Sequence, residues 1–548
     1  MRERQRKIFS ILSRPVKYSV RKISELAKIP KSSVHRHKKA IEKRNLYPES
    51  FFWEISEGQQ FLSRLIFATI FVFGIMCGVG AGKISFFFKL LRLTMHVGVS
   101  PTSVRNLRTQ MEEIIIEYQK VQEKHCKSRK PIKVAVGADE TFFNNMILVF
   151  MDLASGYIFF EEEAQNRSYE TWMEKVQKTI NELGISIKYV VSDRAKALIK
   201  LALKGIGRQS IPDLFHASNE IVKLLGLSLN RKHAAVQNRI DRATATLSLL
   251  IELSKGINEI EKQRLVVNNL DKEQQIIESA ISRYKEVLHK LSKIVHPFDI
   301  ADTSKQTSAQ VQILLMKLPE VIKIILDECG LIDKKDRLGK FTRQIVAIAS
   351  LVDAWWLWVM ESLNDYEIDD ECRKWLLKFL LPAIYWQSQA AKTKNPELKK
   401  SYQAAFEQAS AELEQHPLTP IFITQQWLSW AEWMVSNFQR TSSAVEGRNG
   451  CLSQMHHNGR GIPIKRLKAL TVIHNFGLTR SDGTTAAERL FERDFPDLFE
   501  WIIKQMGDLP LSRMGRKSSP ALTLISIDPS MLIKMNPLNL LTILHIKC

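Results

Sequence analysis

Short apolar runs separated by turn residues set one part of the chain apart from the rest. Runs of this length, rich in β-branched and aromatic residues, predict strands, whereas longer stretches with apolar residues every three or four positions predict helices. The predicted order is βββαβαβ, with strands at Ile132–Asp139, Met146–Leu153, Tyr157–Ala164, Ile187–Asp193 and Ile211–Ala217, and helices at Ser168–Leu183 and 195–206. We therefore expect a mixed sheet with its first three strands antiparallel.

The N-terminal region has a helical pattern that is interrupted by small polar residues. Val20–Ala27 and Val34–Arg44 predict two helices joined at "KIPKSS", with Ser32 or Ser33 as the N-cap of the second. Two helices joined by a tight turn, the second strongly basic, are typical of a helix-turn-helix DNA reader. The alternative is a basic helical hairpin on the surface. A second, weaker pattern of this kind surrounds "GVSPTS" and places Arg105 on its second helix.

The remaining chain divides by pattern into a long helical stretch, a basic segment and a tail. Eight of the eleven tryptophans lie between Trp355 and Trp433, which predicts a separate aromatic core there. We predict a helix-turn-helix DNA-binding domain at 1–50 and a second helical DNA-binding domain at 51–130. An α/β core follows at 131–220 and 436–505, interrupted by an α-helical insertion at 221–435, and a poorly ordered tail covers 506–548.

One uncharged segment also allows a different interpretation. Leu65–Gly82 runs eighteen residues without a charge, long enough to be considered as a membrane span. Its second half is rich in glycine, so we favour a buried helix that ends in a turn, and we predict no membrane partner.

The charge distribution says more about possible binding partners than the overall composition does. The 548-residue chain has a formal net charge of +21, and such a balance favours polyanions. Residues 1–50 carry fifteen Lys and Arg against four acids, and residues 440–480 carry seven against Glu446 alone. The six cysteines are scattered without a CxxC pair, which argues against a zinc ribbon or a disulfide framework and suits a reducing cytoplasm.

Three acids carry the candidate chemistry. Asp139 and Asp193 end the first and fourth predicted strands, which such a sheet brings side by side. Clustered carboxylates repel one another unless a cation lies between them, and Mg²⁺ is held by carboxylates together with substrate phosphates. Glu446 is the candidate third ligand of a two-ion site. Glu140 is a rival to Asp139, because adjacent strand residues point to opposite faces and only one of them should face the metals.

The ordered set resembles the DDE transposases of bacterial insertion sequences, which have an RNase H-like catalytic core. The matching stretches are "GADETFF" with Asp139, "VVSDRA" with Asp193 and "SSAVEGRNG" with Glu446. "DLFH", ending at His216, is similar to the D-x-x-H element of Mutator-like and hAT-type transposases, and a 252-residue helical insertion separates Asp193 from Glu446.

The resemblance implies a transposase that cleaves and joins DNA strands at the ends of an insertion sequence. It implies Asp139, Asp193 and Glu446 as catalytic residues and ligands of two Mg²⁺ or Mn²⁺ ions, double-stranded DNA as partner, a homodimer on DNA, and a bacterial cytoplasmic, nucleoid-associated location. His216 is either a phosphate contact or a core histidine. The predicted DNA-binding residues are Arg36, Lys38, Lys39, Lys43, Arg105, Arg440, Arg448, Arg460, Lys465 and Arg466. The alternative is a catalytically inactive, transposase-derived DNA-binding protein.

Overall fold

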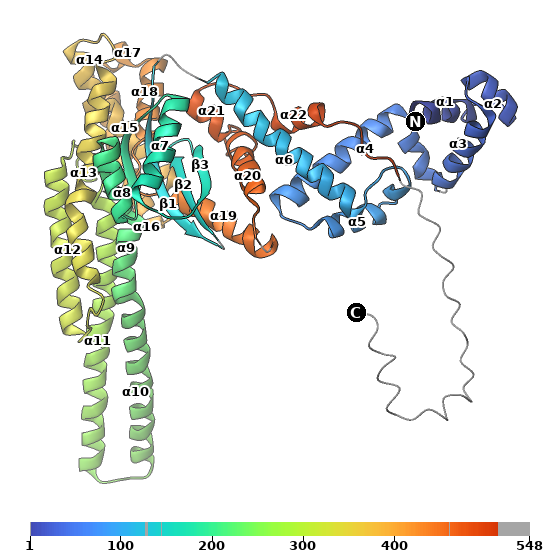
Figure 1. Ribbon diagram of the computed structural model, residues 1–548. Helices are drawn as coiled ribbons and strands as arrows, with labels where there is room; N and C mark the ends of the chain where they lie inside the picture. Colours follow the sequence, from blue (N-terminus) through green and yellow to red (C-terminus); the bar gives the residue numbers. More distant parts are fainter. Residues whose placement is uncertain (1, 46, 127–129, 144, 460, 513–548) are drawn as a thin grey trace. The chain divides into compact units, whose positions relative to one another are not determined.

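The computed structural model describes residues 2–45, 47–126, 130–143, 145–459 and 461–512. The chain forms two compact units. The first contains Met1–Thr69, Ala81–Leu107 and the segment that begins at Gly507; the second contains Ile70–Gly80 and Arg108–Met506. Each unit is described separately below, and Figure 1 shows their elements.

Three short helices open the first unit: α1 (Arg2–Leu12), α2 (Val20–Ala27) and α3 (Lys31–Arg44). They pack on one another around Ile8, Ile23 and Val34. Ser19 caps α2 through its side chain, but the predicted serine cap of α3 is wrong. Pro30 occupies the N-cap position, so Ser32 and Ser33 lie inside the first turn. Proline suits this position because the first helical turn leaves its N–H groups unpaired in any case.

The first unit continues with η1 (Pro48–Glu54), α4 (Ser56–Thr69), α5 (Ala81–Leu90), η3 (Leu93–Met95) and the first turns of α6 (Pro101–Lys124). Pro101 begins α6 directly after the "GVS" break. Pro510 accepts a hydrogen bond from the Gly98 amide at 2.8 Å, so the start of the predicted tail is tied to this unit. Residues 513–548, the rest of that tail, lie outside the described residues.

Two helical segments among the described residues are long and apolar enough to cross a membrane, Ser56–Met76 and Arg337–Leu363. The second is α13, a core helix described below. The first ends in the π-helical turns η2 (Ile70–Met76), which pack on α20 and, through Phe71 and Phe499 at 5.4 Å between ring centroids, on α22. Protein packing thus buries part of the stretch that also suggested a membrane span, whereas Val72 and Phe73 remain exposed.

A five-stranded mixed sheet organises the second unit. Its order is β3-β2-β1-β4-β5, with β1–β2 and β2–β3 antiparallel and β1–β4 and β4–β5 parallel. The predicted strand order is found, but two of the predicted boundaries differ by three residues or more. The strands are β1 (Ile132–Phe142), β2 (Met146–Asp152), β3 (Ile158–Ala164), β4 (Ile185–Ser192) and β5 (Gln209–Pro212).

The two differing boundaries both concern the end of the sheet that carries the acids. β1 runs three residues beyond Asp139, because its hairpin ladder with β2 continues to the pair Phe142–Met146. β5 is shorter than predicted, since Asp213 caps a new helix, α9 (Leu214–Ile221), by accepting the Phe215 amide at 2.7 Å.

Helices cover both faces of the sheet. α7 (Tyr169–Leu183) packs on one face, where Phe160 of β3 lies against Trp172, and is followed by α8 (Lys196–Lys200) and η4 (Leu201–Ile206). The other face carries α13, α19 and α20. On the edge strand, Asn475 of α20 pairs with both backbone groups of Ile158 at 2.9 Å, which completes hydrogen bonding that an edge strand otherwise leaves open.

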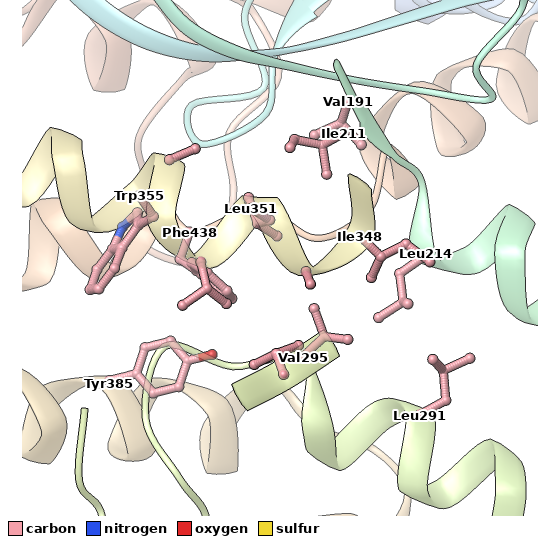
Figure 2. Close-up of a cluster of buried hydrophobic side chains, with 14 of the residues drawn as sticks. Val191, Ile211, Leu214, Leu291, Val295, Ile348, Leu351, Trp355, Tyr385 and Phe438 are labelled. Atoms are coloured by element: carbon pink, nitrogen blue, oxygen red, sulfur yellow. The ribbon is translucent and has the colours of Figure 1, made fainter. Parts of the chain in front are cut away.

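The long middle region is helical, as its pattern predicts. Figure 2 shows how α13 joins it to the sheet: Leu351 and Trp355 lie in one apolar cluster with Val191 of β4. Trp427 and Trp430 are buried, so the aromatic stripe is core. The elements are η5 (Val222–Gly226), α10 (Leu227–Glu252), α11 (Ile257–Ile294), α12 (Ser308–Glu328), α13 (Arg337–Leu363), α14 (Asp370–Trp375), η6 (Leu376–Leu380), α15 (Leu381–Lys392), α16 (Pro396–Gln415), α17 (Thr419–Phe422) and α18 (Gln425–Ser436).

After this region the chain returns to the sheet. The four returning helices are α19 (Ser443–Gly459), α20 (Ile464–Phe476), α21 (Ala486–Phe491) and α22 (Leu498–Gln505). α19 lies on β1 and β2, and α20 lies on β3. The return of α19 brings the third predicted acid to the strands that carry the first two.

Candidate metal centre

Three carboxylates converge where β4 ends beside β1. The parallel pairing of the two strands stops at Ala138–Ser192, so the next residues, Asp139 and Asp193, leave the ladder side by side. One carboxylate oxygen from each of Asp139, Glu140 and Asp193 lies within 4.8 Å of the other two. These residues form a compact group of oxygen ligands of the kind that holds a divalent cation.

Asp139 and Glu140 both belong to this group of carboxylates, although only one of them was expected to face the metals. The two side chains do leave opposite faces of β1: Asp139 meets Asn449 of α19, whereas Glu140 lies on the side of α7, near Arg167 and Trp172. Because β4 has already ended, the Asp193 carboxylate can lie at the open edge of β1, between the two faces. Both neighbours therefore reach it.

The backbone after Asp193 turns sharply. Arg194 has φ of +64°, a left-handed conformation that non-glycine residues rarely adopt. The Asp193 carboxylate accepts the Ala195 amide at 2.9 Å, and the Ser192 hydroxyl accepts the Arg194 amide at 3.2 Å. Such strained positions cluster at functional sites, and here the turn keeps Asp193 directed toward β1.

Two contacts bring α19 against the acids. A Cβ on Gly137 would lie 2.8 Å from Val445 and 2.7 Å from Leu153, so only glycine lets the helix approach β1 this closely. The buried Asp213 carboxylate accepts the Ser442 amide at 3.0 Å and also its hydroxyl. This second contact ties the cap of α9 to the residue before α19.

The position of α19 places two side chains at the site. His216 Nε2 donates to Glu446 Oε1 at 2.9 Å, and both residues are partly exposed. Asn449 donates through Nδ2 to Asp139 Oδ2, also at 2.9 Å. Glu446 is close enough to act on Asp139 electrostatically, but the compact ligand group contains Glu140 instead. His216 pairs with a site carboxylate rather than lying in the core.

Asn449 is the site residue that sequence reasoning missed. It follows Glu446 by three positions, so both project from the same side of α19. A helix that presents Glu446 to the sheet must therefore also present residue 449. If Glu446 is taken as a site residue, this spacing predicts that Asn449 also lies at the site. It does not predict that the Asn449 amide donates to Asp139.

The electrostatics of the group favour a bound cation. Burial, together with the nearby Glu446 and Asp193 charges, raises the pKa of Asp139 from 3.8 to about 7. Burial and Asp193 also raise the pKa of Glu140, and Arg167 only partly offsets this. A divalent cation between such carboxylates stabilises their anionic forms, which burial and mutual repulsion otherwise disfavour.

The predicted DNA-binding residues of the first unit remain on its surface. Arg36, Lys39 and Lys43 are exposed on one side of α3, and Lys38 is partly exposed near Glu42. Arg105 is exposed near the start of α6.

Three arginines of the basic segment 440–480 are engaged inside the protein, contrary to the expectation that they face DNA. Arg448 is buried in a two-point ion pair with Glu161, at 2.7 and 2.9 Å. Arg440 donates to the Ser292 carbonyl at 2.9 Å, where it supports the helical region. Arg448 thereby balances a buried carboxylate, and Arg440 adds to the hydrogen bond that the Ser292 carbonyl also accepts from Tyr402.

The remaining basic candidates of that segment divide in a similar way. Arg466 is buried and pairs with Glu112 of α6 at 3.0 Å. Lys465 pairs with Glu113 and stays partly exposed, so it alone among the described candidates of this segment keeps a surface position. Arg460 lies outside the described residues.

A family model matches part of the chain. Residues 376–518 match a family model described as a family of unknown function (DUF6399), which covers about a quarter of the chain. The matched segment includes Glu446 and Asn449 but neither Asp139 nor Asp193. No curated protein matches the chain.

Proposed function

We propose that this protein is a DNA transposase of the DDE class, which cleaves a phosphodiester bond at an element end and joins the freed 3′-hydroxyl to target DNA. The observation that carries the proposal is the convergence of carboxylates from three distant stretches, Asp139 with Glu140, Asp193, and Glu446, at one end of a sheet. The sheet order, with β4 beside β1, supports an RNase H-like interpretation of the core.

The donor set fits Mg²⁺ or Mn²⁺. It offers only oxygen ligands, which hard divalent cations prefer, and Asp139 has a pKa that makes it half protonated near neutrality without a counter-charge. Asp139, Glu140 and Asp193 would hold the ions, with Glu446 within electrostatic range. Bound ions of this kind activate an attacking oxygen and stabilise a leaving one.

The chain's own residues keep this donor set in place. Asn449 fixes the orientation of the Asp139 carboxylate, and His216 holds Glu446 away from its acidic neighbours. The hydrogen bond from His216 restrains Glu446 in this position, and a change of the Glu446 rotamer would break it. The His216–Glu446 pair would thus keep the glutamate available to the site while no cation is bound.

DNA binding is proposed for the exposed basic side of α3. Arg36, Lys39 and Lys43 recur every three to four residues and so share one helix surface. Lysine and arginine on one helix side neutralise backbone phosphates, and such binding weakens as salt increases. Lys465, which is partly exposed and paired with Glu113, is the described candidate from the second unit that has a surface position for this role.

The test is a strand-cleavage assay on DNA carrying the element's own flanking sequences, with Mg²⁺ present. We expect the wild type to nick and Asp193→Asn to lose at least about a hundredfold in rate, since a metal ligand is removed while size and fold are retained. Asp327→Asn, an exposed acid on α12, is the matched control and should cleave normally.

Equal cleavage by the wild type and Asp193→Asn would refute the catalytic proposal. Specific DNA binding by both proteins, with cleavage by neither, would instead identify a transposase-derived DNA-binding protein. In that case Arg36→Ala with Lys39→Ala should abolish binding, whereas the Asp193→Asn protein should bind as well as the wild type.

A further inference from the structure

A cavity of about 820 Å³ lies in the second unit at the start of β1, the end of that strand opposite to the acids. Its walls come from β1, the β2–β3 turn, the chain after α13, and the helices α18 and α21. Lys133 in this wall precedes Asp139 by six residues, or about 20 Å along a strand, so the cavity is separate from the candidate metal centre. Its volume is in the range of pockets that hold small organic ligands, roughly 300–1,000 Å³.

Two arginines line this cavity without a close carboxylate. Arg480 is exposed and donates from Nη1 to the Ala154 carbonyl at 3.2 Å. Arg489 donates to the Ser155 carbonyl at 2.9 and 3.0 Å, and the acid that it pairs with, Asp482, is 3.9 Å away. The other charges of the lining offset one another, since Lys133 pairs with Asp365 at 2.8 Å and Lys130 is matched by Glu492. Carbonyl groups position the two guanidinium groups but do not neutralise them, so this part of the cavity favours an anion.

The same cavity is lined by a buried carboxylate with one unpaired oxygen. Asp152 is 2% exposed, and its Oδ2 accepts the Ser155 amide at 2.8 Å and the Ser155 hydroxyl at 2.5 Å. Its Oδ1 has no hydrogen-bond partner among the described residues. A buried acceptor is costly to leave unpaired, and an N–H group of a bound molecule would supply the missing donor. Because the two arginines repel a cationic donor, the group that suits this position is a neutral amino group.

Aromatic side chains form a third part of the wall. Tyr366 and Trp433 line the cavity and are partly exposed. Edge-to-face contacts hold both rings against the aromatic core: Tyr366 meets Trp427 at 5.1 Å and Trp433 meets Trp358 at 5.5 Å between ring centroids. Aromatic rings fixed in this way provide surfaces on which a planar, aromatic ligand stacks.

We propose that this cavity binds a nucleotide whose phosphate groups pair with Arg480 and Arg489, whose base stacks on Tyr366 or Trp433, and whose amino group donates to Asp152. A nucleotide combines the anion, the aromatic plane and the neutral donor that the three parts of the wall favour. A simple anion would leave Asp152 Oδ1 unpaired, and an amine would meet two arginines. The proposal does not depend on the catalytic activity and applies equally to a protein that only binds DNA.

The test titrates the full-length protein with ATP that carries a fluorescent label on its ribose, and follows the fluorescence anisotropy. EDTA is present, so that binding through Mg²⁺ at the acids does not contribute. We expect a dissociation constant below about 100 µM for the wild type. Arg480→Glu should raise it at least about tenfold, because a negative charge then faces the phosphates. Asp152→Asn should do the same, since it keeps an oxygen for Ser155 but turns an N–H₂ group toward the amino group of the base.

Competing ligands separate the parts of the nucleotide. Unlabelled ATP should displace the label from the wild type at a concentration at least about tenfold lower than inorganic triphosphate or UTP, whose base has no amino group. A single-stranded oligonucleotide that competes better than ATP would identify an unpaired nucleotide of DNA as the natural ligand, and one that competes less well would identify a free nucleotide. Either result supports the site.

Arg264→Glu is the matched control. Arg264 is exposed on α11, so this variant has the same change of charge outside the cavity and should bind as the wild type does. Circular dichroism verifies that each variant is folded. The proposal would be overturned if labelled ATP failed to bind at millimolar concentration, or if Arg480→Glu and Asp152→Asn bound it like the wild type. Equal competition by inorganic triphosphate and ATP would also overturn it, because the cavity would then be an anion site that does not read a base.

Discussion

The pKa of Asp139 makes the stability of the metal-free protein depend on pH in a predictable direction. A carboxyl whose pKa is raised from 3.8 to about 7 by folding is more readily protonated in the folded state. The contribution of this protonated carboxyl to the unfolding free energy is fully present below pH 4 and is lost as the pH rises through 7. Asp139→Asn removes this titration but keeps an oxygen that can accept from Asn449.

The size of the effect follows from the same values. A difference between 3.8 and about 7 corresponds to about 4 kcal/mol at 1.36 kcal/mol per pKa unit. Because the titration of Asp139 is coupled to its acidic neighbours, we expect about half of this, roughly 2 kcal/mol, to belong to Asp139. In EDTA, Asp139→Asn should match the wild type at pH 4 and exceed its unfolding free energy by that amount at pH 8.

Urea denaturation at pH 4, 5, 6, 7 and 8 measures this difference, with Asp327→Asn, an exposed acid far along the chain on α12, as the control. Addition of Mg²⁺ at pH 8 should reverse the order of the two proteins. A site saturated a hundredfold above its dissociation constant stabilises the wild type by about 2.7 kcal/mol, and the variant should gain much less. A stability difference that stays constant from pH 5 to pH 8, or is unaffected by Mg²⁺, would refute this account of the site.

Three further substitutions test the surroundings of the site. Gly137→Ala should cost about 1–3 kcal/mol of stability and reduce cleavage, because the new Cβ displaces Val445 and with it α19; a fully active, stable variant would contradict this. Arg448→Leu should lower the unfolding free energy by about 3–5 kcal/mol, because it leaves the buried Glu161 carboxylate without its ion-pair partner. A variant that loses DNA affinity but no stability would contradict this and indicate a surface role for Arg448. Burial lowers the pKa of His474 from 6.5 to about 4. The neutral side chain therefore stabilises the folded protein less as the pH falls from 6.5 through 4. In urea denaturation over this range, the unfolding free energy of His474→Gln should fall less steeply than that of the wild type.

The order of strands and helices could be predicted because it depends on local pattern. Strand alternation and turn residues located all five strands, and the pairing of β4 with β1 followed from their order. The boundaries depended on tertiary partners. β1 extends past Asp139 because β2 pairs with it, and β5 is short because Asp213 caps a helix and reaches Ser442 from far along the chain.

The fate of individual charges could be predicted only in part. Arg448 lies two residues after Glu446, about 200° around the helix, so a helix that directs Glu446 to the site directs Arg448 elsewhere. That argument was available from sequence. The acid that receives Arg448 was not, because Glu161 is 287 positions away, and the same holds for Arg466 with Glu112. A count of basic residues cannot separate internal ion pairs from a surface for DNA.

The late arrival of α19 in the chain has a consequence for biosynthesis. Ribosomes release β1 and β4 long before Glu446 and Asn449 exist, so a nascent or prematurely terminated chain lacks the helix that orients Asp139. Whatever chemistry the acids perform is thereby postponed until the helical region has been synthesised and has folded back onto the sheet. Incomplete products retain α1–α3 but lack α19.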